Sequence, residues 1–322
     1  MTLDLAEVVQ PHSDVPADLH CGRDGWLFLI GGTNRVKDIF GEESAVDSEK
    51  IDSWSSLLLE RQRRARQLGA DYLHVVVPEK LTVYSEFSGL DGINIKNSAV
   101  HRLSEYVARR DFDALVDCLT PMLRQKRFRN LYYKTDTHWN FHGCLCAYLE
   151  VCRMSGAIPA GHVLSPTFNK TMLTLDLGSK LTNPIEEEFR VYNFTRYSSR
   201  THSNAIVNYK EACGRENDGG WHVGSHVIFS NGAEVADPRR VVIFGDSFSE
   251  YRRHLLTGLL AETFHEVHFI WSTSIDWSYV ELQKPSLVLT EIAERFLTSV
   301  PTDTFSLENY AKSKMEGLPL TT

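Results

Sequence analysis

The sequence predicts an α/β fold built on a parallel sheet, because short apolar runs alternate with amphipathic helical patterns. The run at 72–78 is apolar almost throughout and ends in proline, which is typical of a strand buried on both faces of such a sheet. Before it, residues 47–69 place Ile, Trp and Leu along one face of a long helix. The same alternation returns after residue 238, so we expect right-handed crossovers and reactive groups at the carboxyl ends of strands.

The other elements follow from local patterns. Residues 1–20 show little pattern, and 24–32 reads as a turn, a short buried strand and a second turn. Helices are expected at about 98–109, 113–126 and 137–154, the last capped by Asp136 or Thr137. From about 163 to 238, Asn, Gly, Ser and Thr punctuate short β-like runs, which indicates a β-rich insertion. Strands at 240–244, 266–271 and 286–291 then alternate with helices at 249–263 and 277–283. We therefore expect an N-terminal arm (1–21), a main domain (22–303) that includes the insertion, and a C-terminal tail (304–322).

Composition excludes several classes of partner. The net charge is −8, and the one cluster of basic residues, at 61–66, is interpreted as the solvated face of a helix. Nucleic acid is therefore not expected as a partner. No apolar run reaches the length of about 18 residues that a transmembrane helix needs. The acidic start does not resemble a signal peptide, and the six cysteines are unevenly spaced, so we expect a cytoplasmic protein without a disulfide framework.

Two short segments carry the chemistry. The segment 133–140 supplies Asp136 and His138, and the segment 241–249 reads as a buried strand that ends in Gly-Asp-Ser, with Ser247 at the edge of the sheet. Together they offer a nucleophile, a base and an orienting carboxylate, the set needed for acyl transfer through a serine. A helix directly after Ser247 would also aim backbone N–H groups at the space above the serine.

Simpler interpretations of both segments stay open at this point. Ser247 could cap a helix, and Asp136 could cap the helix that begins near Thr137. On a regular helix His138, His142 and Cys146 would share a face, as in half of a metal site. No further pair of ligands appears, so we expect no metal, and we interpret Cys144, Cys146 and Cys152 as core residues.

The joint pattern resembles a known family. The blocks that carry the resemblance occur in the same order: 22–28, Val77-Pro78-Glu79-Lys80 with Tyr84, Asp136-Thr137-His138-Trp139, Asp176-Leu177-Gly178-Ser179-Lys180-Leu181, Gly245-Asp246-Ser247-Phe248-Ser249 and Glu294-Arg295. Over about residues 22–300 the chain resembles the SGNH-hydrolase-like domain of alginate O-acetyltransferases of the AlgJ and AlgX type. The resemblance implies a flavodoxin-like α/β/α sandwich whose catalytic residues are permuted, since ordinary SGNH enzymes carry the serine before the Asp-x-x-His motif.

The resemblance also assigns roles. It implies that Ser247 is the nucleophile, His138 the general base and Asp136 the residue that orients His138. The backbone N–H of Ser247 is the natural oxyanion donor, with Gly178 or Ser179 as candidates for a second. Trp139, Tyr251, Trp271 and Trp277 could stack on sugar rings, although each also fits a place in the core or at its rim. As substrate-binding residues we name Trp139, Tyr251, Ser179 and Lys180.

These assignments lead to a carbohydrate or polysaccharide O-acetyltransferase that forms an acetyl-serine intermediate. The alternatives are an acetyl esterase that uses the same triad, and a non-catalytic glycan-binding protein. We expect no permanently bound cofactor, acetyl-CoA or another acetyl donor as co-substrate, a sugar or polysaccharide as acceptor, and partner proteins of a glycan-modification pathway. The alginate enzymes are exported to the periplasm, which differs from the cytoplasmic location expected here.

Overall fold

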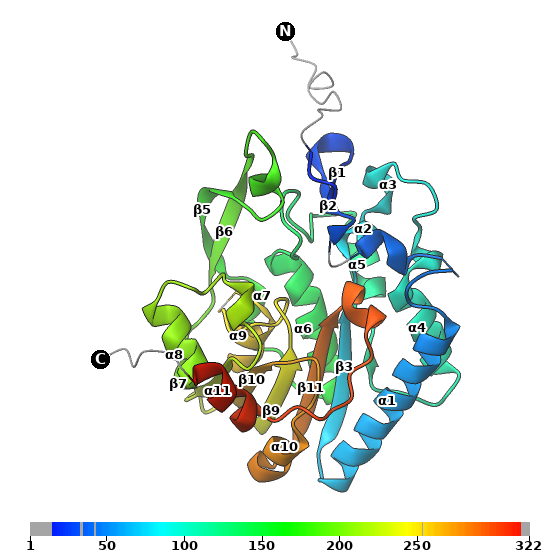
Figure 1. The fold of residues 1–322 in the computed structure, drawn as a ribbon. Helices are drawn as coiled ribbons and strands as arrows, with labels where there is room; N and C mark the ends of the chain where they lie inside the picture. Colours follow the sequence, from blue (N-terminus) through cyan, green and yellow to red (C-terminus); the bar gives the residue numbers. More distant parts are fainter. Residues whose placement is uncertain (1–14, 33–34, 42, 253, 317–322) are drawn as a thin grey trace.

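A mixed sheet forms the centre of the protein (Figure 1). The computed structural model describes residues 15–32, 35–41, 43–252 and 254–316. In spatial order the sheet consists of β4 (Leu115–Val116), β3 (Asp71–Val77), β11 (Leu287–Ala293), β9 (Asp237–Gly245), β10 (Phe264–Trp271), β8 (His226–Asn231) and β7 (Ser198–Ser203). Strands β4 to β10 in this order run parallel, and β8 lies antiparallel to both β10 and β7. The predicted parallel core is therefore confirmed, and an antiparallel edge extends it.

Helices form two layers around this sheet (Figure 1). Helix α1 (Ser48–Gln67) packs against β3 and against α4 (Ala99–Ala108), while α6 (Phe141–Ser155) packs against β3, β4 and α9 (Leu256–Ala261). The central strands are buried on both faces, and Val241 to Phe244 of β9 are fully enclosed. The predicted α/β sandwich is confirmed.

The remaining elements surround this core. They are β1 (Leu19–Cys21), β2 (Leu27–Leu29), α2 (Lys80–Val83), α3 (Ser85–Ser88), α5 (Leu119–Gln125), α7 (Gly161–Leu164), β5 (Thr167–Thr174), β6 (Glu186–Asn193), α8 (Ala205–Ala212), α10 (Trp277–Gln283) and α11 (Leu307–Met315), with short 3-10 turns that include Gly178–Lys180 and Glu294–Thr298. Within the described residues, no helix combines the length and the apolar character needed to cross a membrane.

The β-rich segment predicted at 163–238 divides into two structural parts. Strands β5 and β6 form a separate two-stranded hairpin that rises from the body of the protein (Figure 1). Strands β7 and β8 instead join the edge of the central sheet. The division of the chain into arm, main domain and tail stays a prediction, and residues 1–14 of the arm lie outside the described part of the chain. The expected C-terminal tail contains helix α11, which packs on α8.

Three local predictions were wrong. The segment expected as a helix at 113–126 begins with strand β4, and only α5 is helical. The helix expected at 249–263 is confined to α9, because a turn follows β9. Arg61, which we placed on a solvated face, is 1% exposed, and its guanidinium donates to both carboxylate oxygens of Asp303 at 2.6 and 2.9 Å. The pairing with the partly buried Asp303 thus places Arg61 in the interior, although the cluster 61–66 looks solvated in the sequence.

Candidate active site

Ser247 lies in a tight turn directly after the central strand β9. Asp246 holds this turn, since its Oδ1 accepts the N–H of Phe248 at 2.9 Å and its Oδ2 accepts the N–H of Ala293 at 2.8 Å. The second bond ties the turn to the end of β11, the neighbouring parallel strand. Among the described residues after Ser247, the next helix begins only at Leu256, so the alternative of Ser247 as an N-cap and the expected helical N–H groups above the serine were both wrong.

A buried acid lies below this turn. Glu291 of β11 is 1% exposed, and its Oε2 accepts the hydroxyl of Ser249 at 2.6 Å and the N–H of Asp246 at 3.1 Å. Burial and the negative charge of Asp246 raise the pKa of Glu291 well above its usual value. A Cβ on Gly245 would lie 2.9 Å from Glu291 Oε2 and closer still to Ser249 Oγ. Glycine is therefore required where the strand passes these two side chains.

His138 lies in a loop just before helix α6. The helix begins at Phe141, and its cap is Asn140, whose Oδ1 accepts the N–H groups of His142 at 2.9 Å and Gly143 at 3.3 Å. The predicted start near residue 137 and the cap at Asp136 or Thr137 were therefore wrong. His138 precedes the helix, so it shares no helical face with His142 and Cys146.

Side chains from other elements hold this loop in place. Lys80 of α2 is 3% exposed, and its ammonium donates to the carbonyls of Tyr133, Lys134 and Asp136 at 3.1, 3.0 and 2.5 Å. Glu187 of β6 accepts the N–H groups of Lys134 at 3.0 Å and of Thr135 at 2.8 Å. Burial lowers the pKa of Lys80 to about 8, although nearby carboxylates oppose this effect.

The two segments bring Asp136, His138 and Ser247 into one hydrogen-bonded chain. Asp136 Oδ1 accepts the backbone N–H of His138 at 2.7 Å and its Nδ1–H at 2.8 Å. Because Nδ1 carries the proton, Nε2 is the acceptor, and it lies 2.9 Å from Ser247 Oγ. Burial works to lower the pKa of His138, but the hydrogen bond and charge of Asp136 outweigh it, so the pKa is raised. The arrangement has the geometry of a serine, base and carboxylate triad.

A cleft of about 630 Å³ opens over Ser247 and His138. The segment after the nucleophile forms one wall, with Glu250, Arg252 and His254. The hairpin forms the other, with Leu173, Phe189 and further residues. Asp176 also lines the cleft; it belongs to one of the family blocks, but sequence reasoning assigned it no role. Sequence reasoning missed most of the other lining residues, including Arg190, Tyr192, Asn217, His222, Glu250, Arg252 and His254. No motif marks these residues, which come from loops and from the hairpin.

The predicted substrate residues do not all reach this cleft. Ser179 lines it, as does Trp139, although Trp139 is only 2% exposed and meets Phe248 edge-on at 5.3 Å between ring centres. Tyr251 is not among the lining residues, and its ring lies beside Lys210 and Phe269. Lys180 forms an ion pair with Asp18 at a separate cavity of about 210 Å³. The structure therefore does not bring Tyr251 and Lys180 to the cleft.

The predicted oxyanion donors differ in availability. Among the described residues, the N–H of Ser247 makes no hydrogen bond. The N–H of Gly178, in contrast, donates to the carbonyl of Thr135 at 2.9 Å. A Cβ on Gly178 would lie 2.6 Å from the carbonyl oxygen of Ile185, so the glycine permits a close crossing of chains. In this structure Gly178 is a packing residue whose N–H is already engaged.

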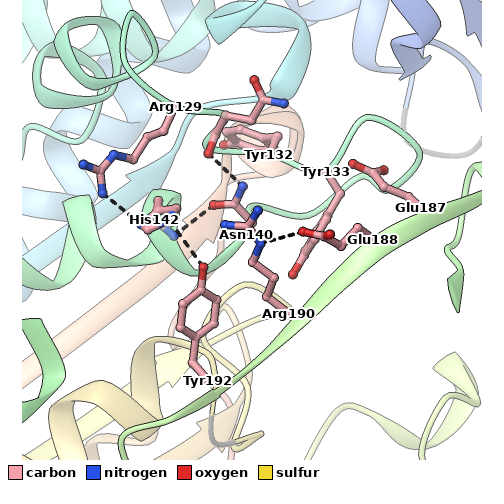
Figure 2. A pocket seen from close by; sticks show the side chains of 10 residues that line it. Arg129, Tyr132, Tyr133, Asn140, His142, Glu187, Glu188, Arg190 and Tyr192 are labelled. Atoms are coloured by element: carbon pink, nitrogen blue, oxygen red, sulfur yellow. Dashed lines mark hydrogen bonds and ion pairs between the residues drawn. The ribbon is translucent and has the colours of Figure 1, made fainter. Parts of the chain in front are cut away.

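A second pocket of about 460 Å³ adjoins the cleft and shares lining residues with it (Figure 2). His142 lies in its wall between Arg129, at 3.4 Å from Nδ1, and the hydroxyl of Tyr192, at 3.3 Å from Nε2. Burial, followed by the charges of Arg129 and Arg190, lowers the pKa of His142 to about 4. The ring is therefore neutral at pH 7, with Nδ1 accepting from Arg129 and Nε2–H donating to Tyr192.

Comparisons with known proteins give a family match over part of the chain. The family model described as "SGNH hydrolase-like domain, acetyltransferase AlgX" matches residues 19–171, a range that contains Asp136 and His138 but not Ser247. No curated protein matches the sequence.

Solved structures share the fold at low sequence identity. The O-acetyltransferase domain of Pseudomonas putida AlgJ is 16% identical, with a TM-score of 0.58 over 93% of this chain and 99% of that one. Bacillus cereus PatB1 is 15% identical, with a TM-score of 0.57 over 86% and 96%. Pseudomonas aeruginosa AlgX is 14% identical, with a TM-score of 0.51 over 93% and 67%. The resemblance predicted from the sequence is therefore confirmed: residues 19–171 match the family model, and the solved structures of AlgJ and AlgX share the fold of the chain.

Proposed function

We propose that this protein is a carbohydrate O-acetyltransferase that works through an acetyl-Ser247 intermediate. The observation that carries the proposal is the unbroken chain from Asp136 Oδ1 through His138 to Ser247 Oγ, with distances of 2.8 and 2.9 Å. The family match to an acetyltransferase domain and the fold shared with the O-acetyltransferase domain of AlgJ support the same reaction class.

In the first half-reaction, Ser247 Oγ attacks the carbonyl carbon of an acetyl donor while its proton passes to His138 Nε2. Asp136 stabilises the resulting imidazolium, and the free N–H of Ser247 faces the developing oxyanion. His138 then returns the proton to the leaving group as the bond from the acetyl carbon to that group breaks. The acetyl group is left on Ser247, and the donor leaves in its protonated form.

In the second half-reaction, His138 takes the proton of an acceptor hydroxyl, whose oxygen attacks the acetyl-serine. The acetyl ester passes to the acceptor, and the proton returns to Ser247. A sugar hydroxyl makes the protein a transferase, whereas water makes it an esterase that uses the same triad. The cleft and the adjoining pocket favour a sugar, because together they offer aromatic rings and hydrogen-bonding groups well beyond Ser247.

The identity of the donor, whether acetyl-CoA or another acetyl carrier, and the partner proteins stay predictions. The cytoplasmic location expected from the sequence also stays a prediction, and fractionation of expressing cells would test it.

The proposal is tested by intact-protein mass spectrometry after exposure to p-nitrophenyl acetate. We expect an acetyl adduct on the wild type that is absent in Ser247→Ala and retained in Ser179→Ala, a second serine of the same cleft. A sulfonyl fluoride should label the same residue, and one structure of PatB1 carries a sulfonyl adduct. If Ser247→Ala still forms both the acetyl and the sulfonyl adduct, the serine mechanism is overturned. If the wild type forms no adduct, a non-catalytic glycan-binding protein is the better description.

A partition experiment separates transferase from esterase. Release of p-nitrophenol and of acetate is followed with and without oligosaccharide acceptors. A transferase releases less acetate per p-nitrophenol as the acceptor concentration rises. A ratio that stays at one with every acceptor would leave the esterase as the better description.

A further inference from the structure

Asp176 contacts the catalytic loop although it comes from a distant part of the chain. It follows strand β5, and both of its carboxylate oxygens bond to Thr137. Oδ1 accepts the N–H of Thr137 at 2.8 Å, and Oδ2 accepts its hydroxyl at 2.5 Å. Thr137, the residue between Asp136 and His138, is 7% exposed. The clamp therefore acts on the one peptide segment that joins the base to its orienting carboxylate.

This clamp constrains the geometry of the triad. His138 lies outside the hydrogen-bonded ladder of α6, so side-chain contacts fix its backbone. Lys80 and Glu187 hold the earlier part of the loop, and Asp176 is the contact nearest to His138. Thr137 Oγ1 also lies 3.2 Å from His138 Nδ1, so the oriented hydroxyl shares the Nδ1 proton with Asp136.

The charge of Asp176 also faces the imidazole. One side-chain nitrogen or carboxylate oxygen of each of Asp136, His138 and Asp176 lies within 4.8 Å of the corresponding atoms of the other two residues. Desolvation, and then the charge of Asp136, raise the pKa of Asp176, whereas His138 lowers it. Asp176 in turn acts with Asp136 to raise the pKa of His138, and Arg295 opposes both. The charged and titratable groups that act on this pair or respond to it are Asp136, Lys80, Arg295, Glu250 and His254.

We propose that Asp176 is a positioning residue for the proposed acetyl transfer: it fixes Thr137, and its charge adds to that of Asp136 opposite the imidazolium. The inference rests on the proposed function for its effect on rate. Its effect on His138 is independent of that function, because the imidazole titrates whether or not the protein turns over.

The test measures the titration of His138 by NMR in wild type and Asp176→Asn, alongside the pH profile of kcat/KM for p-nitrophenyl acetate. Loss of one carboxylate at this distance, in a partly solvated site, should lower the His138 midpoint by about 0.5 to 1 pH unit. The acid limb of kcat/KM should move by the same amount, and its plateau should fall about tenfold. Glu186→Gln removes an equal charge from the exposed end of β6 and should leave the midpoint unchanged.

Two further variants separate position from charge. Thr137→Val removes the hydroxyl's bond to Asp176 and its 3.2 Å contact with His138 Nδ1 but keeps the carboxylate, so the rate should fall while the His138 midpoint drops less than in Asp176→Asn. If Asp176→Asn does not fold, the NMR titration of His138 is measured in Asp176→Ser, a second variant without the carboxylate. An unchanged His138 midpoint in the neutral variants overturns the proposal. A shifted midpoint in an enzyme that shows no acetyl transfer upholds the electrostatic effect and counts against the proposed function instead.

Discussion

Replacing Asp136 with asparagine should disable the triad while leaving the loop in place. Asp136 Oδ1 accepts both the N–H and the Nδ1–H of His138, at 2.7 and 2.8 Å. An asparagine can offer an oxygen or an NH₂ group to the ring. If the NH₂ group faces Nδ1, the proton moves to Nε2, and the ring can no longer accept the proton of Ser247.

The lost charge sets the lower limit of the effect. A carboxylate about 4 Å from the centre of an imidazolium contributes about 4 kcal/mol at an effective dielectric constant near 20. The side chains of His138 and Asp136 are 31% and 15% exposed, so solvent reduces this attraction. About 2 to 3 kcal/mol then remains, which corresponds to about 30- to 150-fold in rate. Population of the wrong tautomer adds to this loss, so kcat/KM should fall by about 10² to 10⁴.

The pH profile should change in a defined direction. His138 must be neutral to act as the base, so activity rises as the pH increases through the pKa of His138. Asp136 raises that pKa against the effect of burial. The asparagine variant should therefore show its acid limb at lower pH than wild type, even as the plateau falls.

The assay is hydrolysis of p-nitrophenyl acetate from about pH 5 to 9, with thermal unfolding to confirm that the variant folds. Glu186→Gln serves again as the matched loss of one charge. A folded Asp136→Asn variant with the kcat/KM and acid limb of wild type would refute the assignment of Asp136. If the kcat/KM plateau falls but the acid limb stays at the pH of wild type, only the predicted effect of the Asp136 charge on the pKa of His138 is refuted.

Two predictions concern the support of the site. Gly245→Ala places a methyl group against Glu291 and Ser249, so the free energy of unfolding should fall by about 1 to 3 kcal/mol and kcat should drop as the turn shifts; an unchanged melting temperature would contradict this packing argument. Arg295→Met leaves Glu79 buried without the guanidinium that lies 2.9 Å away, which should cost about 3 to 5 kcal/mol in urea unfolding. The second expectation fails if Arg295→Met alone is as stable as the double variant Arg295→Met with Glu79→Gln.

The sequence predicted the strands at the centre of the sheet because they are largely apolar. Strands β9, β10 and β11 and helices α1, α4 and α10 lie close to the predicted ranges. Interactions between residues far apart in the chain changed the rest. The turn after β9 looks like a helix start in sequence, but Asp246 holds it through a bond to Ala293 of another strand. Likewise, β7 and β8 look like part of a separate lobe in sequence, but β8 pairs with β10 and β7 pairs with β8.

In the site, too, local motifs could be recognised in the sequence, whereas contacts between distant residues could not. The sequence could identify Asp136, His138 and Ser247 because each lies in a short motif. It could not place Asp176 beside His138, because the two residues lie 38 positions apart in the chain and only the fold brings them together. It also assigned Gly178 to the oxyanion, although this glycine is needed for the close approach of Ile185. A glycine in a motif does not reveal whether its N–H is free.

The two halves of the triad are held by different kinds of interaction. Ser247 follows a strand that is paired on both sides, and Asp246 joins its turn to the backbone of a third element. In the loop that carries His138, the carbonyls of Lys134 and Thr135 also accept backbone N–H groups. The backbone groups of Asp136 and Thr137, next to His138, bond instead to the side chains of Lys80 and Asp176, and Glu187 holds the preceding residues. Backbone pairing survives most single substitutions, whereas each of these side chains can be removed by one. Variation that tunes the rate without loss of the fold should therefore concentrate around His138 rather than around Ser247. Two of the three anchors, Glu187 and Asp176, come from the hairpin segment that also lines the cleft, so a ligand that moves the hairpin would act directly on the base.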